Sequence, residues 1–202
     1  MNIFFDLDGT LIDSKERLYR LFQHLVPESN FTFEEYWEYK KARINHKEIL
    51  NNQFKYSNTN IESFEKDWMS SIESSEWLNY DKPIEGIFEY LTKLKLKNDL
   101  YVVTARQSEN MLKAQFENFK WTGIFKKIFI TFQKYDKYDL IRDDIKVDKN
   151  DWFVGDTGLD ILTGKKLGIK TAAVLSGFLS KDKLMEYNPD IIAENVMGIE
   201  FN

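Results

Sequence analysis

The stretch of residues 3–11 constrains the fold of this chain more than any other part of the sequence. Three apolar residues, Ile3-Phe4-Phe5, predict a short buried strand. Asp6 and Asp8 follow directly, with one leucine between them and with glycine and threonine after them. In an open parallel sheet, ligands bind outside the carboxyl ends of the strands. We therefore expect a ligand site at the end of this strand.

The chemistry that such a pair of carboxylates permits is phosphoryl transfer. Asp6 would attack as the nucleophile, and Asp8 would give and take the leaving-group proton. Gly9 would let the backbone amides approach a phosphate oxygen, and Thr10 would add a hydroxyl nearby. The alternative is a strand that ends in an Asx-type turn, where these residue types are all common.

Strand-like and helix-like segments alternate in most of the chain. Further strands are expected at 100–103, 127–131, 152–154, 170–175 and 190–193, and helices at 84–97, 108–119, 138–144 and 159–167. This alternation predicts an α/β fold, a Rossmann-like doubly wound parallel sheet. Several of the strands end in small polar or acidic residues, which would meet along one edge of the sheet.

Residues 14–80 lack a convincing strand and are expected to form an inserted all-helical cap subdomain. Ser14 is placed to cap its first helix, and three pairs with capping-box spacing predict the others: Thr32 with Glu35, Asn45 with Glu48, and Thr59 with Glu62. The segment Asp81-Lys82-Pro83 reads as the return hinge. The expected organisation is therefore a catalytic core of residues 1–13 and 81–202 with a cap of residues 14–80.

Composition narrows the classes of function. The net charge of −5, with acids and bases interspersed, offers no basic stripe, so no nucleic acid polymer is expected as a partner. The chain has no cysteine, which excludes disulfides and thiol catalysis and favours a reducing cytoplasm. No apolar run approaches the length of about 18 residues that crosses a membrane. We expect a soluble, cytoplasmic protein without a membrane partner; composition leaves monomer or dimer open.

Three motifs resemble those of the haloacid dehalogenase superfamily, in its phosphatase branch. Residues 5–11, Phe-Asp-Leu-Asp-Gly-Thr-Leu, resemble the first motif, and the second acid, Asp8, favours phosphate chemistry over carbon–halogen cleavage. Residues 102–106, Val-Val-Thr-Ala-Arg, resemble the second. Residues 155–160, Gly-Asp-Thr-Gly-Leu-Asp, resemble the fourth, and residues 161–169 extend the similarity to the phosphoglycolate-phosphatase-like branch.

The resemblance implies roles for particular residues. Thr104 would donate a hydrogen bond to the transferring phosphoryl group. A Mg2+ cofactor would be held by Asp6, by Asp8 through a nearby backbone carbonyl, and by Asp156, with Asp160 ordering a metal-bound water or the loop. The third motif supplies a lysine, for which Lys134 and Lys137 compete. We favour Lys137 because an expected helix begins directly after it.

The implied function is hydrolysis of a small phosphate monoester, a phosphorylated metabolite, through an aspartyl-phosphate intermediate. The alternatives are a phosphomutase of the same superfamily and, from a different class, a non-catalytic phosphate-binding or phosphoreceiver module. Candidate substrate contacts besides Gly9 and Thr10 are Ala105 and Arg106, although Arg106 also fits a solvated loop. In the cap the candidates are Arg17, Arg20, Arg43 and Lys47, with a solvated turn as the alternative, and His46 is expected on the surface.

Overall fold

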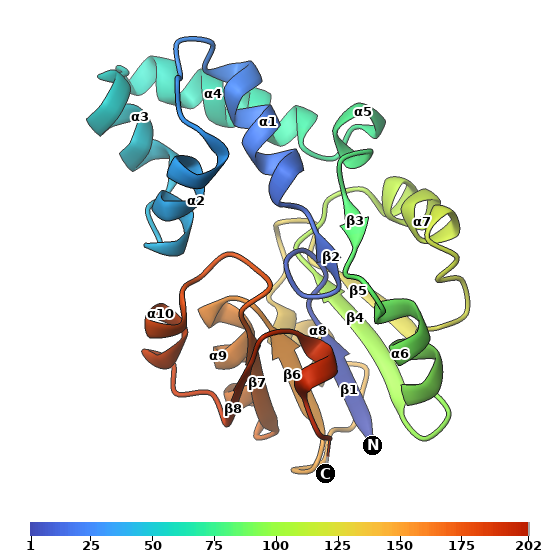
Figure 1. Cartoon of the computed structure of the whole chain (residues 1–202). Helices are drawn as coiled ribbons and strands as arrows, with labels where there is room; N and C mark the ends of the chain where they lie inside the picture. Colours follow the sequence, from blue (N-terminus) through green and yellow to red (C-terminus); the bar gives the residue numbers. More distant parts are fainter. Residues whose placement is uncertain (202) are drawn as a thin grey trace.

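The strands of the main sheet are all parallel. The computed structural model describes residues 1–201, and within them six strands are ordered β5-β4-β1-β6-β7-β8 (Figure 1). Their bounds are β1 (Asn2–Phe5), β4 (Asp99–Thr104), β5 (Lys127–Ile130), β6 (Trp152–Gly155), β7 (Lys170–Val174) and β8 (Ile191–Ala193). Because β1 lies in the middle, between β4 and β6, its end is flanked by the ends of both neighbours.

Helices cover both faces of this sheet because successive side chains of a buried strand point to opposite faces. Ile3 and Phe5 pack with α6 (Ile87–Leu94) and α7 (Glu109–Asn118) on one face. Phe4 packs on the other face, which is covered by α8 (Lys137–Arg142) and α9 (Gly158–Leu167). The expected doubly wound α/β fold is thus confirmed. The short helix α10 (Lys181–Met185) and the 3-10 helix η1 (Val196–Gly198) complete the described chain.

A group of helices stands apart from the sheet and has an apolar core of its own. It comprises α1 (Lys15–Leu25), α2 (Phe33–Lys41), α3 (His46–Phe54), α4 (Asn58–Ser71) and α5 (Ser75–Leu78), drawn together in the upper part of Figure 1. Phe22 on α1 is fully buried among aromatic side chains of this group. Two short antiparallel strands, β2 (Ile12–Asp13) and β3 (Lys82–Pro83), join the outgoing and returning chain.

The capping signals were only partly predictive of the helix starts. Thr32 and Asn45 form the expected capping boxes with Glu35 and Glu48. The prediction for Thr59 with Glu62 is wrong, because α4 begins at Asn58 and the side chain of Ser57 accepts from the Asn60 amide. Ser14 occupies the N-cap position of α1, but its side chain makes no capping hydrogen bond.

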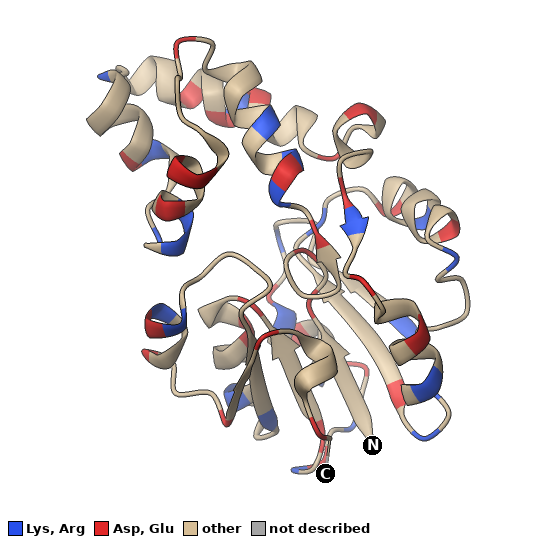
Figure 2. Ribbon diagram, in the orientation of Figure 1, with Lys and Arg blue, Asp and Glu red and all other residues tan. Residues whose placement is uncertain are grey.

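The charges are spread over the whole chain. Lysine and arginine are interspersed with aspartate and glutamate along the ribbon, in the helical group as well as around the sheet (Figure 2). None of the helices in residues 1–201 combines the length and the apolar character needed to cross a membrane.

Candidate active site

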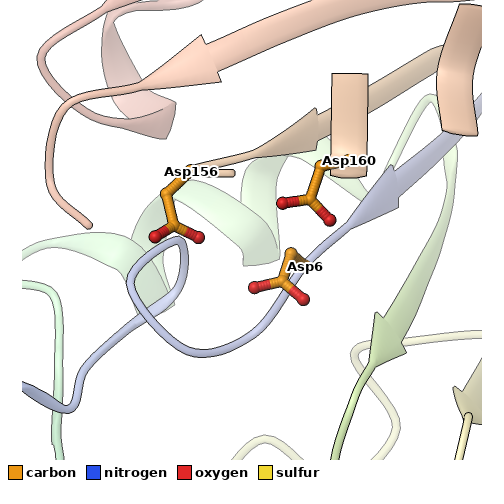
Figure 3. Close-up of side chains that lie close together, drawn as sticks. All are labelled: Asp6, Asp156 and Asp160. Carbon is orange, nitrogen blue, oxygen red and sulfur yellow. The ribbon is translucent and has the colours of Figure 1, made fainter. Parts of the chain in front are cut away.

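Three carboxylates meet at the carboxyl ends of β1 and β6. Asp6 follows β1 directly, and its amide donates to the Val154 carbonyl oxygen on β6 at 2.8 Å. Asp156 follows β6, and Asp160 lies in the first turn of α9. All three residues are buried, and one carboxylate oxygen from each lies within 4.8 Å of those of the other two. Figure 3 shows the three side chains close together.

Lys137 provides a positive charge inside this cluster. Its Nζ donates to Asp6 Oδ1 at 2.5 Å and to Asp160 Oδ1 at 2.7 Å. The position of Lys137 is fixed by the start of α8, where the Asp136 side chain caps the helix by accepting from the Tyr138 amide at 2.7 Å. Lys134, the competing candidate, is exposed.

The cluster carries more negative than positive charge. Burial and the neighbouring Asp160 raise the pKa of Asp6 to about 7, although Lys137 acts in the opposite direction. Burial, together with Asp6 and Asp160, raises the pKa of Asp156 well above its ordinary value. Burial would lower the pKa of Lys137, but the two carboxylates outweigh it and raise that pKa. Three carboxylates with a shortage of positive charge match the oxygen ligands that a hard divalent cation takes.

Asp156 is held in place by loops from both sides. Its Oδ1 accepts from Thr10 Oγ1 at 3.2 Å, and its Oδ2 accepts from the Phe178 amide at 2.8 Å. Gly9, with φ of +84°, and Gly177 press against this carboxylate, and a Cβ atom at Gly177 would lie only 2.0 Å from Asp156 Oδ2. Both positions therefore require glycine, since a side chain would displace the carboxylate.

The Asp160 carboxylate contacts both the start of α9 and Lys137. Its Oδ2 accepts from the Thr157 amide at 3.0 Å and from Thr157 Oγ1 at 2.6 Å, which caps the start of α9. Its other oxygen receives Lys137. The capping bonds therefore fix the carboxylate that positions the lysine.

Asp8 points to a separate group of charges. Its oxygens accept from Arg106 Nε at 2.6 Å, from Arg106 Nη2 at 2.8 Å and from Arg17 Nη2 at 2.5 Å. Burial alone would raise the pKa of Asp8, but the two guanidinium groups outweigh it and lower that pKa. The expectation for Asp8 at the metal concerned a nearby backbone carbonyl and stays a prediction, while its side chain is oriented toward the two arginines.

The remaining residues that the sequence suggested for catalysis or substrate binding lie in different surroundings. Thr104 is buried at the end of β4, and its Oγ1 accepts from the Arg106 amide at 3.3 Å. The Ala105 carbonyl oxygen accepts from Gln133 Nε2 at 2.6 Å. Arg43 has its guanidinium 5.5 Å from the ring centroid of Tyr187. Exposed Arg20 pairs with Glu16, and Lys47 is exposed.

A cavity of about 170 Å³ opens beside Asp8, between the helical group and the edge of the sheet. Its core-side walls come from the loop after β4, including Ala105, Arg106 and Gln107. Its other walls come from α1 and α4, with Phe178 completing it. A small molecule in this cavity would contact Asp8 and Arg106 directly.

Several residues of the site were not expected from the sequence. Phe178 supplies an amide to Asp156, and Asp81 pairs with both Arg17 and Arg106. The Gly177 position had a readable signal, because Ser176 and Gly177 follow β7 just as small and polar residues follow the other strands. Asp81 had none, since a single acid before a lysine and a proline reads as a hinge.

His46 was expected on the surface, and the structure shows it half-buried. Its ring packs among Phe22, Phe64 and Trp68 in the helical group, and its Nε2 lies 2.8 Å from the Tyr36 hydroxyl. Asn45 caps α3 directly before it, which turns the histidine into the aromatic core.

Comparison with known proteins gives consistent results. A family model described as haloacid dehalogenase-like hydrolase matches residues 3–174. The pyrophosphatase PpaX of Halalkalibacterium halodurans is 24% identical over 209 residues, covering 96% of this chain and 92% of that protein.

Solved structures share the fold over almost the entire chain. A haloacid dehalogenase-like family hydrolase from Streptococcus pneumoniae has a TM-score of 0.76 at 23% identity, covering 96% of this chain and 93% of its own. A protein described as a predicted phosphoglycolate phosphatase from Haemophilus somnus has a TM-score of 0.74 at 19% identity, with the same two coverages. Because both structures are less than 25% identical to this chain, the similarity shows a shared fold only.

Proposed function

Since this chain belongs to the haloacid dehalogenase-like hydrolase family, we propose that it is a Mg2+-dependent phosphatase that hydrolyses a small phosphate monoester. The observation that carries this proposal is the buried cluster of Asp6, Asp156 and Asp160 around the Lys137 ammonium group. Asp6 and Asp156 directly follow β1 and β6, at the sheet edge where parallel α/β folds bind ligands, and Asp8, two residues after Asp6, lines a small cavity. The names of the similar proteins, a pyrophosphatase and a phosphoglycolate phosphatase, support phosphate chemistry.

The proposed reaction has two steps. Asp6 attacks phosphorus and forms an aspartyl phosphate, while Asp8 donates a proton to the leaving oxygen. Asp8 then takes a proton from a water molecule that attacks the aspartyl phosphate, which releases inorganic phosphate and restores Asp6. Thr104 would donate a hydrogen bond to the phosphoryl oxygens, and Lys137 would offset their charge.

Mg2+ would be held by Asp6 and Asp156, with Asp160 beside them. When bound, the ion would supply positive charge that offsets the repulsion between a carboxylate nucleophile and a phosphate group. The fit rests on the donor set, because three buried carboxylates share one ammonium group and the pKa of both Asp6 and Asp156 is raised.

We propose that residues 14–80 act as a cap over a core of residues 1–13 and 81–202. Two observations support this division: the helical group has its own aromatic core, and its side chains form one wall of the cavity. A cap in this place would exclude competing water and limit the size of the leaving group.

The test is the release of phosphate from a small activated aryl phosphate and from 2-phosphoglycolate, with Mg2+ or with excess chelator. We expect turnover that needs the metal and that falls at least about a thousandfold in Asp6→Asn, because the amide is no nucleophile. Asp67→Asn, the same change on an exposed acid of α4, is the matched control. Turnover that survives Asp6→Asn would contradict the proposal.

Product analysis separates the alternatives. A phosphatase releases inorganic phosphate in proportion to substrate consumed, whereas a phosphomutase returns the phosphoryl group to a second hydroxyl of the sugar. A phosphoreceiver module would instead give a long-lived phosphoaspartate without turnover. The location of the protein in the cytoplasm stays a prediction.

A further inference from the structure

Two arginines from distant parts of the chain converge on one carboxylate at the cavity. Arg17 comes from α1 and Arg106 from the loop after β4, and both donate to Asp8. Arg106 uses its Nε and Nη2 together on the two oxygens, which is the forked arrangement that arginine presents to carboxylate and phosphate groups.

A second acid lies behind the arginines, on the side away from the cavity. Arg106 Nη2 donates to Asp81 Oδ2 at 3.0 Å, and Arg17 Nε lies 3.2 Å from Asp81 Oδ1. Gln115 Nε2 also donates to Asp81 Oδ2, at 2.8 Å. Asp81 therefore balances one of the two positive charges from within the protein.

Asp8 balances the other charge from the cavity side. Its side chain is 19% exposed, whereas those of Arg17 and Arg106 are each 4% exposed and that of Asp81 is fully buried. The Glu73 carboxylate is also near, but it accepts from the amides of Gln107 and Ser108 at 2.8 and 2.9 Å. The Asp8 carboxylate therefore lies between the two guanidinium groups and the cavity.

This arrangement conflicts with the proposed role of Asp8. To reach the leaving oxygen, its carboxylate has to give up some of its contacts with Arg17 and Arg106. A buried guanidinium group that loses its partner is strongly unfavourable. The loss is offset when other anionic oxygens take the place of Asp8.

We propose that Arg17 and Arg106 form a subsite for an anionic group on the leaving group of the substrate. Asp8 occupies this subsite in the free protein, and the substrate displaces it. The preferred substrates are then small phosphate compounds whose leaving group itself carries a carboxylate or a phosphoryl group. This inference rests on the proposed phosphatase function and assigns selectivity to two named residues.

The cavity favours a leaving group of a few heavy atoms. Its volume of about 170 Å³ is below the about 300–1,000 Å³ of pockets that bury drug-sized ligands. Of its lining residues only Arg17 and Arg106 are cationic. Glu73 also lines it, with its two carboxylate oxygens engaged by the Gln107 and Ser108 amides.

The experiment compares two substrates that differ in one charge. 2-Phosphoglycolate and its neutral amide, carbamoylmethyl phosphate, have the same number of heavy atoms. We expect wild-type kcat/KM to favour the carboxylate by about tenfold or more, because a site built to bind a charged group discriminates against an analogue without it. Arg106→Lys keeps a positive charge beside Asp81 but cannot bind a carboxylate through two nitrogens. It should lower the ratio of the two kcat/KM values at least about threefold.

Arg20→Lys is the matched control, since Arg20 lies one turn from Arg17 on α1, is exposed and pairs with Glu16. It should leave the ratio unchanged. If Arg106→Lys does not fold, product inhibition of the wild type tests the subsite instead. Glycolate should then inhibit competitively at a concentration about tenfold lower than glycolamide does.

The outcomes distinguish this inference from the proposed function. A wild type that hydrolyses both substrates equally well, or only the aryl phosphate, overturns the arginine subsite while the phosphatase assignment stands. A folded Arg106→Lys that keeps the wild-type ratio also overturns it. Failure to hydrolyse any of the three compounds overturns the phosphatase assignment and the subsite with it.

Discussion

Within residues 1–201, the Lys137 ammonium group is the one positive charge that forms ion pairs with the Asp6 and Asp160 carboxylates. From the sequence, Lys134 and Lys137 were both open. The structure distinguishes their surroundings, because Lys137 begins α8 and reaches the cluster while Lys134 is exposed. Its catalytic role stays a prediction, which single substitutions can test.

We predict that Lys137→Ala lowers kcat by about a hundredfold or more, because a preorganised charge that offsets the developing negative charge is worth about that much. Lys134→Ala is the matched control and should keep wild-type turnover. Steady-state phosphate release with each variant measures the effect. Full turnover by Lys137→Ala would show that the assignment of the third-motif lysine is wrong.

At the scale of elements, the helical group holds a polar cluster of half-buried Lys40 and His46 with buried Tyr36 that the proposed reaction does not use. Lys40 on α2 has its Nζ 3.5 Å from His46 Nε2, which also lies 2.8 Å from the Tyr36 hydroxyl. Burial lowers the pKa of Lys40 to about 8. Burial and the nearby Lys40 charge lower the pKa of His46 well below its ordinary value.

These shifts predict how the free energy of unfolding changes with pH. Between about pH 8 and the ordinary lysine pKa of 10.5, the unfolded chain keeps the Lys40 proton and the folded protein releases it. The free energy of unfolding should therefore rise by about 1–2 kcal/mol from pH 7.5 to pH 9.5 through this group. Below about pH 8 its contribution is constant.

Denaturant unfolding of the wild type and Lys40→Met at both pH values measures this contribution. Lys40→Met should lack the rise, and Lys41→Met, on the exposed neighbour that pairs with Glu38, should keep it. Measurements stay below pH 10 because tyrosines then begin to titrate in the unfolded chain. A Lys40→Met protein with the same pH dependence as the wild type would contradict the prediction.

At the scale of the whole molecule, the acidic cluster joins parts of the chain that are far apart in sequence. Asp6 lies at the end of the central strand, and Asp156 and Asp160 lie at the junction of β6 and α9. A cation bound there would link these elements in the folded state only, which stabilises the fold by mass action.

We predict that Mg2+ at about a hundred times its dissociation constant raises the melting temperature by about 5–10 °C at neutral pH. Thermal unfolding with and without chelator, at matched ionic strength, measures the shift. Asp156→Asn should abolish it and Asp67→Asn should retain it. An unchanged melting temperature in the wild type would mean that the cluster does not bind Mg2+ under these conditions.

The sequence by itself determined the fold class and the edge at which the candidate site lies. Alternation of apolar segments encodes a parallel sheet, and strand ends carry their polar residues to one edge whatever the details of packing. Asp6, Thr104 and Asp156 were readable in this way because each directly follows or ends a buried strand. The capping boxes at Thr32 and Asn45 were readable because they are local.

Only the tertiary structure decided which charges pair. The partners of Asp8 come from α1 and from the loop after β4, and Asp81 joins them from the returning linker. No local pattern encodes these contacts, because they depend on how the helical group sits against the sheet. The aromatic burial of His46 and the closeness of Gly177 to Asp156 have the same origin. Sequence spacing specifies neighbours along an element, while side chains from separate elements meet only after the chain has packed.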